Sequence, residues 1–248
     1  MKRILLVVSY DGTGYHGWQI QKNAVTIEEK LNEAIGALTG EKIQVTGASR
    51  TDAGVHALGN VAVFDTESKI PGEKFSYALN RGLPDDIVVQ ESKEVALDFH
   101  PRHVPCKKTY EYTILNRSFP LPEYRNYAML YYGTLDLESM KQAAKAFIGE
   151  HDFAAFCSAG AQVESTVREI YALSVEKNGE LISIRVTGNG FLYHMVRIIA
   201  GTLLEVGKGR ILPEEVEKII ASCDRKNAGP TAPAKGLKLL EICFEEFA

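Results

Sequence analysis

An acid and two bases are crowded into one short loop of the chain. The run Arg50-Thr51-Asp52-Ala53-Gly54-Val55-His56 lies between two stretches that look like β-strands. A carboxylate held on a loop can act as a nucleophile or assist departure of a leaving group, and a nearby cation favours its ionised form. An Asp two residues after an Arg is also a common turn or capping group, and the pattern alone favours that plainer interpretation.

A second group that could take part in chemistry is Arg197, which lies within the apolar segment 191–200. The apolar residues around it form one stripe at helical spacing: Leu192, Val196, Ile199 and Leu203. A guanidinium stays charged, and burying it without a partner is costly. Arg197 therefore needs a carboxylate brought to it by the fold. Asp52 is a candidate, but the pattern does not select it over Asp11 or Glu111.

Hydrophobic periodicity and turn residues predict the elements that position the loop of Asp52. In the first hundred residues the expected strands cover 3–10, 43–48, 58–65 and 87–95. The expected helices cover 26–40, with a capping box at Thr26 and a stop at Gly40, and 73–80. This β-α-β-β-α-β order is typical of ferredoxin-like and RRM-like folds.

The second part of the chain partly repeats this order. It is expected to contain strands at 108–115, 167–177, 181–187 and 237–244, and helices at 136–148, 191–206 and 213–222. Asn178-Gly179 predicts a tight hairpin turn. The fold is therefore expected to be α+β, with two ferredoxin-like (RRM-like) halves at 1–100 and 101–248. Their mostly antiparallel sheets would lie side by side, with a catalytic cleft between the halves.

Composition narrows the classes of function. Of the 248 residues 45% are hydrophobic and 24% charged, which is typical of a globular protein that builds its own core. The net charge of −4 counts against a generic nucleic-acid binder, so any RNA-binding charge must be concentrated locally. The segment 99–110 is one such place, because it holds no acid and five bases, namely His100, Arg102, His103, Lys107 and Lys108.

Membrane and metal chemistry are not expected. No apolar run approaches the roughly 20 residues that a bilayer requires. The four cysteines are widely spread, and no Cys or His group has zinc-site spacing. The sequence predicts a cytosolic protein with reduced thiols and without a metal site.

Five segments occur in order along the chain and carry a combined resemblance. They are Tyr10–Gln19, Gly47–Ala57, Lys108–Tyr112, Gly190–Gly201 and Ala228–Leu237. Together they resemble the TruA family of tRNA pseudouridine synthases. The resemblance implies a homodimer that acts without a cofactor on uridines 38–40 in the anticodon stem-loop of tRNA.

The resemblance also implies roles for individual residues. Asp52 matches the catalytic aspartate, and Arg197 matches the arginine that pairs with it. Arg50 matches a residue that flips or holds the target nucleotide, and Tyr110 matches a tyrosine that stacks on the target base. Three further residues are expected to bind the substrate: His56, Lys107 and Lys108.

Two other functions compete with this interpretation. A non-catalytic RNA-binding protein with RRM-like halves would carry an aromatic and basic motif on its central strands, and the chain has no good copy of it. A glycosidase usually needs a pair of acids at the bond, whereas the matched loop holds one. Tyr110 has its own plainer interpretation, because it alternates with Tyr112 and Ile114 along a strand and could belong to the core.

Overall fold

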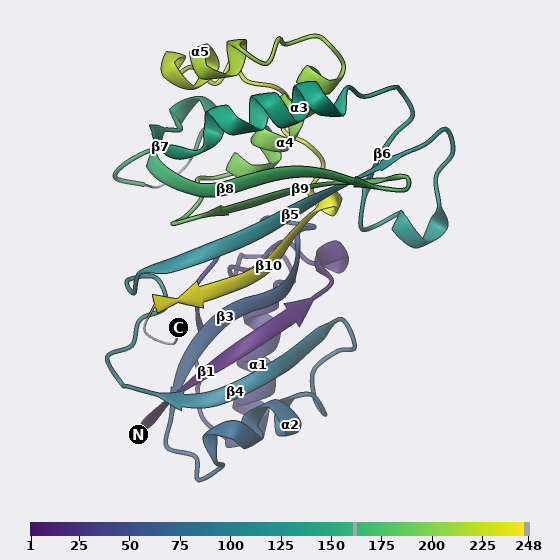
Figure 1. Ribbon diagram of the computed structural model, residues 1–248. Helices are drawn as coiled ribbons and strands as arrows, with labels where there is room; N and C mark the ends of the chain where they lie inside the picture. Colours follow the sequence, from purple (N-terminus) through teal and green to yellow (C-terminus); the bar gives the residue numbers. More distant parts are fainter. Residues whose placement is uncertain (161–162, 246–248) are drawn as a thin grey trace. The chain divides into compact units, whose positions relative to one another are not determined.

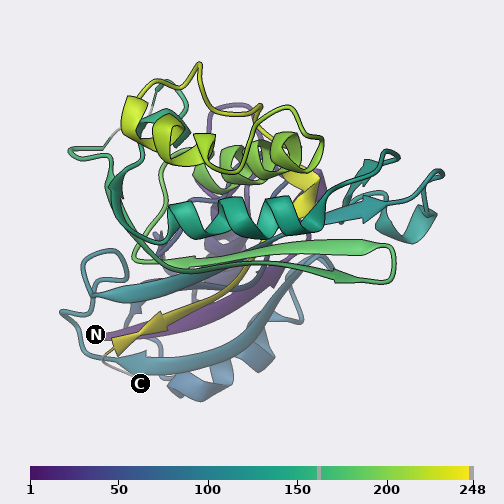
Figure 2. The same cartoon turned by 45° about the horizontal axis from the view of Figure 1, so that its top comes forward.

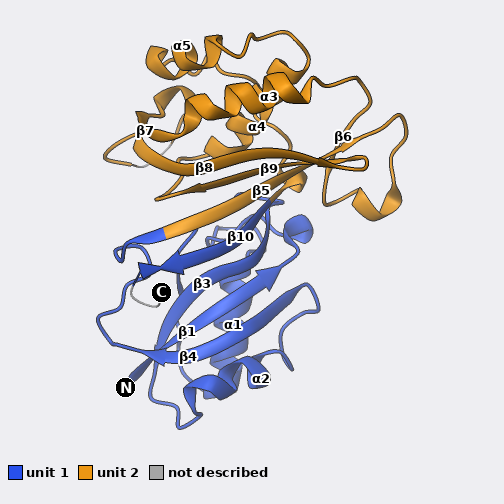
Figure 3. Cartoon of the chain, in the orientation of Figure 1, with its two compact units in different colours: residues 1–106, 238–248 blue, residues 107–237 orange. Residues whose placement is uncertain are grey.

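The computed structural model describes residues 1–160 and 163–245, which form a mixed α+β structure (Figure 1). Its contacts divide the chain into two compact units (Figure 3). Unit 1 comprises Met1–Cys106 and Lys238–Ala248, and unit 2 comprises Lys107–Leu237. The α+β class agrees with the sequence. The division differs from the expected boundary at residue 100, because the last strand joins the first unit. The two ferredoxin-like halves stay a prediction.

The sheet of unit 1 has the order β4-β1-β3-β10, and a short β2 also pairs with β3. These strands are β1 (Lys2–Tyr10), β2 (Thr46–Gly47), β3 (His56–Thr66), β4 (Ile87–Val95) and β10 (Leu237–Phe244). β1 is antiparallel to both β3 and β4. β10 runs parallel to β3, with Lys238 opposite His56. The strand expected over 43–48 is reduced to the two residues of β2.

Two helices cover one face of this sheet (Figure 1). α1 (Ile27–Thr39) begins where the Thr26 hydroxyl accepts a hydrogen bond from the Glu29 backbone N–H, and it ends at Gly40 with φ of +74°. Both ends confirm the expected capping. The buried residues Ile27, Leu31 and Ile35 recur at helical spacing. α2 (Phe75–Leu79) is shorter than expected, because a 3-10 turn occupies the residues just before it.

In unit 2 the strands lie in the order β5-β9-β8-β7, with β6 parallel to β5. Its strands are β5 (Cys106–Asn116), β6 (Met129–Tyr131), β7 (Gly149–Asp152), β8 (Val167–Asn178) and β9 (Leu181–Gly188). β8 and β9 form the expected hairpin, and Gly179 takes a φ of +59° in its turn. An Asn-Gly turn is favoured there because it tolerates positive φ.

Three helices complete unit 2: α3 (Leu137–Ala144), α4 (Met195–Gly207) and α5 (Glu215–Ser222). α3 lies alongside the β8–β9 hairpin in both views (Figures 1 and 2). α4 is the most apolar helix, and its side chains are buried almost throughout. It starts at Met195 rather than at the expected residue 191, because His194 adopts a φ of +64° that an α-helix cannot contain.

None of the helices in the described part of the chain is both long and apolar enough to cross a membrane.

Candidate active site

The loop that carries Asp52 connects β2 to β3 in unit 1. Its backbone is fixed on both sides of the half-buried Asp52. The Trp18 N–H donates to the Thr51 carbonyl at 3.0 Å, and the Gly54 N–H donates to the Tyr15 carbonyl at 3.2 Å. The Val55 N–H closes a turn onto the Asp52 carbonyl at 3.1 Å. These three hydrogen bonds hold the main chain on both sides of Asp52.

A buried polar network lies under the same loop. The Tyr10 hydroxyl and Thr51 Oγ1 are 2.7 Å apart. Asn60 Nδ2 donates to the Tyr10 hydroxyl at 3.2 Å and to the Ser49 carbonyl at 3.0 Å. All four residues are buried. The sequence analysis missed this support, although an Asn in the middle of a strand, where Asn is disfavoured, could have pointed to it.

Two glycines let the turn after β1 approach the loop of Asp52. A Cβ at Gly12 would lie 2.0 Å from the Val55 carbonyl oxygen. A Cβ at Gly17, whose φ is +88°, would lie 2.6 Å from the Thr51 carbonyl oxygen. Because these neighbours are backbone atoms, they cannot move aside as a side chain could. The turn therefore shapes the backbone around Asp52.

Replacing Gly17 by alanine should lower the free energy of unfolding by about 2–4 kcal/mol, from the positive φ and the clash together. Gly40→Ala is the matched control, because Gly40 has a φ of +74° but nothing lies within 4 Å of an added Cβ. It should lose only about 1 kcal/mol. Urea denaturation measures both values. Equal losses of unfolding free energy in the two variants would show that the close approach of Gly17 to the loop of Asp52 adds no cost.

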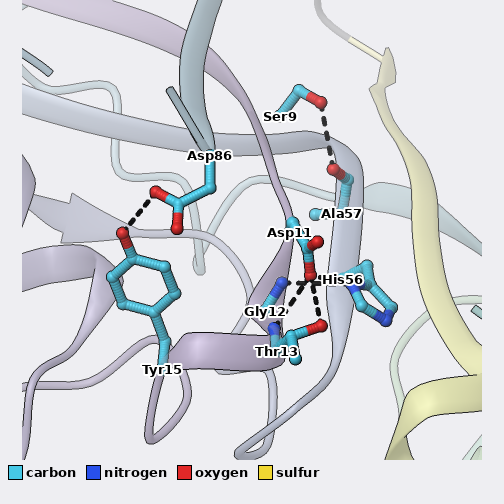
Figure 4. A network of polar contacts seen from close by, with 8 residues as sticks. All are labelled: Ser9, Asp11, Gly12, Thr13, Tyr15, His56, Ala57 and Asp86. Carbon is cyan, nitrogen blue, oxygen red and sulfur yellow. Dashed lines mark hydrogen bonds and ion pairs between the residues drawn. The ribbon is translucent and has the colours of Figure 1, made fainter. Parts of the chain in front are cut away.

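His56 is tied to the turn after β1 (Figure 4). Its Nδ1 accepts the Gly12 N–H at 3.1 Å and lies 3.1 Å from Asp11 Oδ1. Asp11 Oδ1 also accepts from the Thr13 N–H at 2.9 Å and the Thr13 hydroxyl at 2.6 Å. The His56 side chain is only 7% exposed. This arrangement favours a positioning role, and its expected contact with substrate stays a prediction.

Tyr15 extends the same network. Its hydroxyl donates to Asp86 Oδ1 at 2.5 Å (Figure 4). The Asp11 N–H donates to the Asp86 carbonyl at 3.0 Å. Burial and this carboxylate raise the pKa of Tyr15 well above its ordinary value. The hydroxyl therefore stays protonated and anchors the turn that supports the loop of Asp52.

In unit 2, Arg197 lies half-buried on the first turn of α4. Its Nε donates to the Ala232 carbonyl at 2.7 Å, and the Ala232 N–H donates back to the Arg197 carbonyl at 3.1 Å. The same segment approaches α4 at Gly201, where a Cβ would lie 1.8 Å from the Pro230 carbonyl oxygen. Sequence reasoning looked for a carboxylate and missed this partner, because a main-chain carbonyl leaves no mark on residue type.

Tyr110 and the two lysines lie on β5 of unit 2. Tyr110 is 7% exposed, and its ring meets Phe191 edge to face, with centroids 5.2 Å apart. Lys107 Nζ lies 5.3 Å from the centre of the Tyr171 ring. Lys108 is half-buried and pairs with Gly188. Both interpretations of Tyr110, as core residue and as base-stacking residue, remain open on this geometry.

The expected site residues thus fall into two groups. Unit 1 brings together Asp52, His56 and Arg50, which is exposed on the loop of Asp52. Unit 2 carries Tyr110, Lys107, Lys108 and Arg197. Over residues 1–160 and 163–245, no three His, Cys, Asp or Glu side chains form a group that could hold a metal ion.

Comparison with known proteins adds a second line of evidence. A family profile described as tRNA pseudouridine synthase matches residues 6–103 and 143–245. A protein of Acetivibrio thermocellus named tRNA pseudouridine synthase A is 52% identical over 246 residues, covering 98% of this chain and 100% of the relative. The proteins of the same name from Ruminiclostridium cellulolyticum and Brevibacillus brevis are 54% and 48% identical, with the same coverage.

Proposed function

Because the chain belongs to the family of tRNA pseudouridine synthases, we propose that it converts uridines 38–40 of the tRNA anticodon stem-loop to pseudouridine, with Asp52 as the nucleophile. At the coarser level the chain is an isomerase that acts on tRNA. The observation that supports the role of Asp52 is its loop, whose backbone is fixed on both sides of the residue by hydrogen bonds to Trp18 and Tyr15.

The proposed reaction needs a carboxylate more than it needs a cofactor. The N1–C1′ glycosidic bond breaks, the uracil turns over, and C5 joins C1′, with no net oxidation or reduction. An aspartate can attack the sugar or the base and later leave, so that it is regenerated at the end of the cycle. Arg197 is the proposed cationic partner of Asp52. Its Nε bond to Ala232 fixes the plane of the guanidinium, and the planar fork of a guanidinium matches the geometry of a carboxylate.

The target uridine must leave the helical stack before a side chain can reach it. Tyr110 is proposed to receive the extruded base, replacing about 1–3 kcal/mol of lost stacking. Its buried ring would then exchange part of its contact with Phe191 for the base. Arg50 is exposed on the loop of Asp52 and can follow the nucleotide as it turns out. His56, Lys107 and Lys108 are proposed to contribute to substrate binding.

The proposal also includes the arrangement of the two halves and the oligomeric state. Two ferredoxin-like halves would form a catalytic cleft between them, and two copies of the chain would form a homodimer that binds the anticodon stem-loop. A non-catalytic RNA-binding protein remains the alternative that the following experiment tests directly.

Release of tritium from C5 of uridine separates these possibilities. A tRNA transcript made with 5-tritiated uridine should lose tritium when the protein joins C5 to C1′, and a binding protein should release none. A control transcript without uridines at positions 38–40 should lose no label. Release from this control would refute the anticodon site while keeping the chemistry, and no release from either transcript would refute the proposed activity.

A further inference from the structure

Two arginines of unit 1, Arg50 and Arg102, lie at the loop of Asp52. Arg102 is far away in sequence, but its Nε donates to the Gly47 carbonyl at 2.9 Å. Gly47 ends β2 and lies three residues before Arg50, at the start of that loop. This bond fixes Arg102 against the base of the loop. It uses only Nε, so the two terminal nitrogens of the Arg102 guanidinium remain available to a ligand.

The charges of these two arginines are poorly compensated. Burial and the neighbouring Arg50 charge both lower the pKa of Arg102. Glu28 is the one acid that opposes them, and its Oε2 already accepts the Ile20 N–H at 2.9 Å. Within the described residues neither Arg50 nor Arg102 forms a salt bridge. Two like charges held near each other without a carboxylate favour an anion between them.

The two histidines beside Arg102 do not neutralise its charge. The rings of His100 and His103 stack with centroids 3.9 Å apart, and the Arg102 N–H donates to His100 Nδ1 at 3.3 Å. Burial and the charges of His103, Arg102 and Arg3 lower the pKa of His100. Arg3 differs from Arg102, because Asp65 binds it through two hydrogen bonds of 2.7 Å. The uncompensated charge is therefore concentrated at Arg50 and Arg102.

We propose that Arg50 and Arg102 together bind one phosphodiester of the RNA substrate, next to the nucleotide that reaches Asp52. The inference rests on the proposed function and names a contact within it. Guanidinium groups present planar pairs of donors that match the two non-bridging oxygens of a phosphate. Both side chains belong to exposed residues, and Arg50 is two residues from Asp52. A phosphate held here fixes the RNA backbone while the base is out of the helix.

The test combines an arginine variant of the protein with a tRNA in which one phosphodiester is replaced by an uncharged linkage. Arg102→Gln should weaken binding of full-length tRNA by about 10- to 100-fold, as expected for a lost charged hydrogen bond. It should also reduce the slope of log affinity against log salt by about one. The matched control is Arg81→Gln, which removes an exposed arginine of the same unit and should change neither quantity.

The RNA arm uses tRNAs assembled by ligation, each with one methylphosphonate linkage in the anticodon stem-loop. Each is compared with the same tRNA carrying an ordinary phosphate and the same sugar modification at that linkage. At one of these linkages Arg102→Gln should not weaken tRNA binding further, because the phosphate charge that Arg102 binds is already absent. Arg50→Gln should lose its effect at the same linkage, and Arg102→Lys, which keeps the charge, should recover part of the affinity.

Three results would overturn the phosphate contact. The first is that Arg102→Gln binds tRNA as tightly as Arg81→Gln. The second is that Arg102→Gln still weakens binding at every neutral linkage. The third is that Arg102→Lys binds tRNA no better than Arg102→Gln. Thermal unfolding of each variant shows whether the protein remains folded in these measurements. The proposed function fails separately, when the wild-type protein releases no tritium from tRNA.

Discussion

Asp52→Asn is expected to abolish pseudouridine formation while the protein still folds and binds tRNA. The amide keeps the shape of the side chain but is neither charged nor nucleophilic, so the rate should fall by about three to six orders of magnitude. The protein should still fold, because the backbone hydrogen bonds at Thr51, Asp52 and Gly54 do not depend on the charge of the side chain.

Tritium release from tRNA measures this rate, and intact-protein mass spectrometry excludes deamidation back to aspartate. Asp85→Asn is a suitable control, since it removes an exposed acid of the same unit and should leave the rate unchanged. Substantial turnover by purified, undeamidated Asp52→Asn would show that a different group starts the reaction.

The second large effect is expected at Arg197, where stability and catalysis should separate. Arg197→Lys keeps the positive charge and can still reach the Ala232 carbonyl, so stability should change by no more than about 1 kcal/mol. The lysine lacks the planar fork that holds a carboxylate in one orientation. The rate should therefore fall by about 100-fold or more, with tRNA binding retained. Arg210→Lys, at an exposed arginine paired with Glu205, should be active.

A double-mutant cycle tests the proposed partner of Arg197. Removing one member of a fully buried ion pair costs about 3–5 kcal/mol, and the cost should be smaller here because Arg197 is only half-buried. The stability losses of Arg197→Ala and Asp52→Ala should therefore sum to more than the loss in the double variant. Strictly additive losses would mean that the two side chains do not interact, and that Arg197 meets a different carboxylate.

Most elements of the fold follow from local patterns. The apolar run of β1, the capping residue Thr26 and the Asn-Gly turn of the β8–β9 hairpin each indicate the structure that forms there. The pairing of β10 with β3 has no local cause, because the two strands are far apart in sequence, so the sequence pattern groups β10 with its neighbours in the second half. The start of α4 was misplaced for a different reason, since a positive φ at His194 is unusual for a histidine and cannot be foreseen from hydrophobic spacing.

The parts of the candidate site that consist of side chains could be predicted from the sequence. The loop of Asp52 stood out by its residue types, and its role came from the family resemblance. The groups that hold this loop in place could not be recognised from residue types, because they are mostly main-chain atoms, such as the carbonyls of Thr51 and Tyr15. The same is true of the Ala232 carbonyl at Arg197. Residue types predict where charge and nucleophilicity lie, whereas backbone support depends on the three-dimensional fold.

The parallel pairing of β10 with β3 has a consequence for the order of synthesis. The chain leaves the ribosome N-terminus first, so the loop of Asp52 appears early, while Lys238, the residue that pairs with His56, appears only after all of unit 2. At typical elongation rates that interval lasts on the order of ten seconds. During this time the part of β3 next to the loop is an open sheet edge, available to other chains. Translation therefore delivers Asp52 well before the strand that pairs with β3 beside its loop.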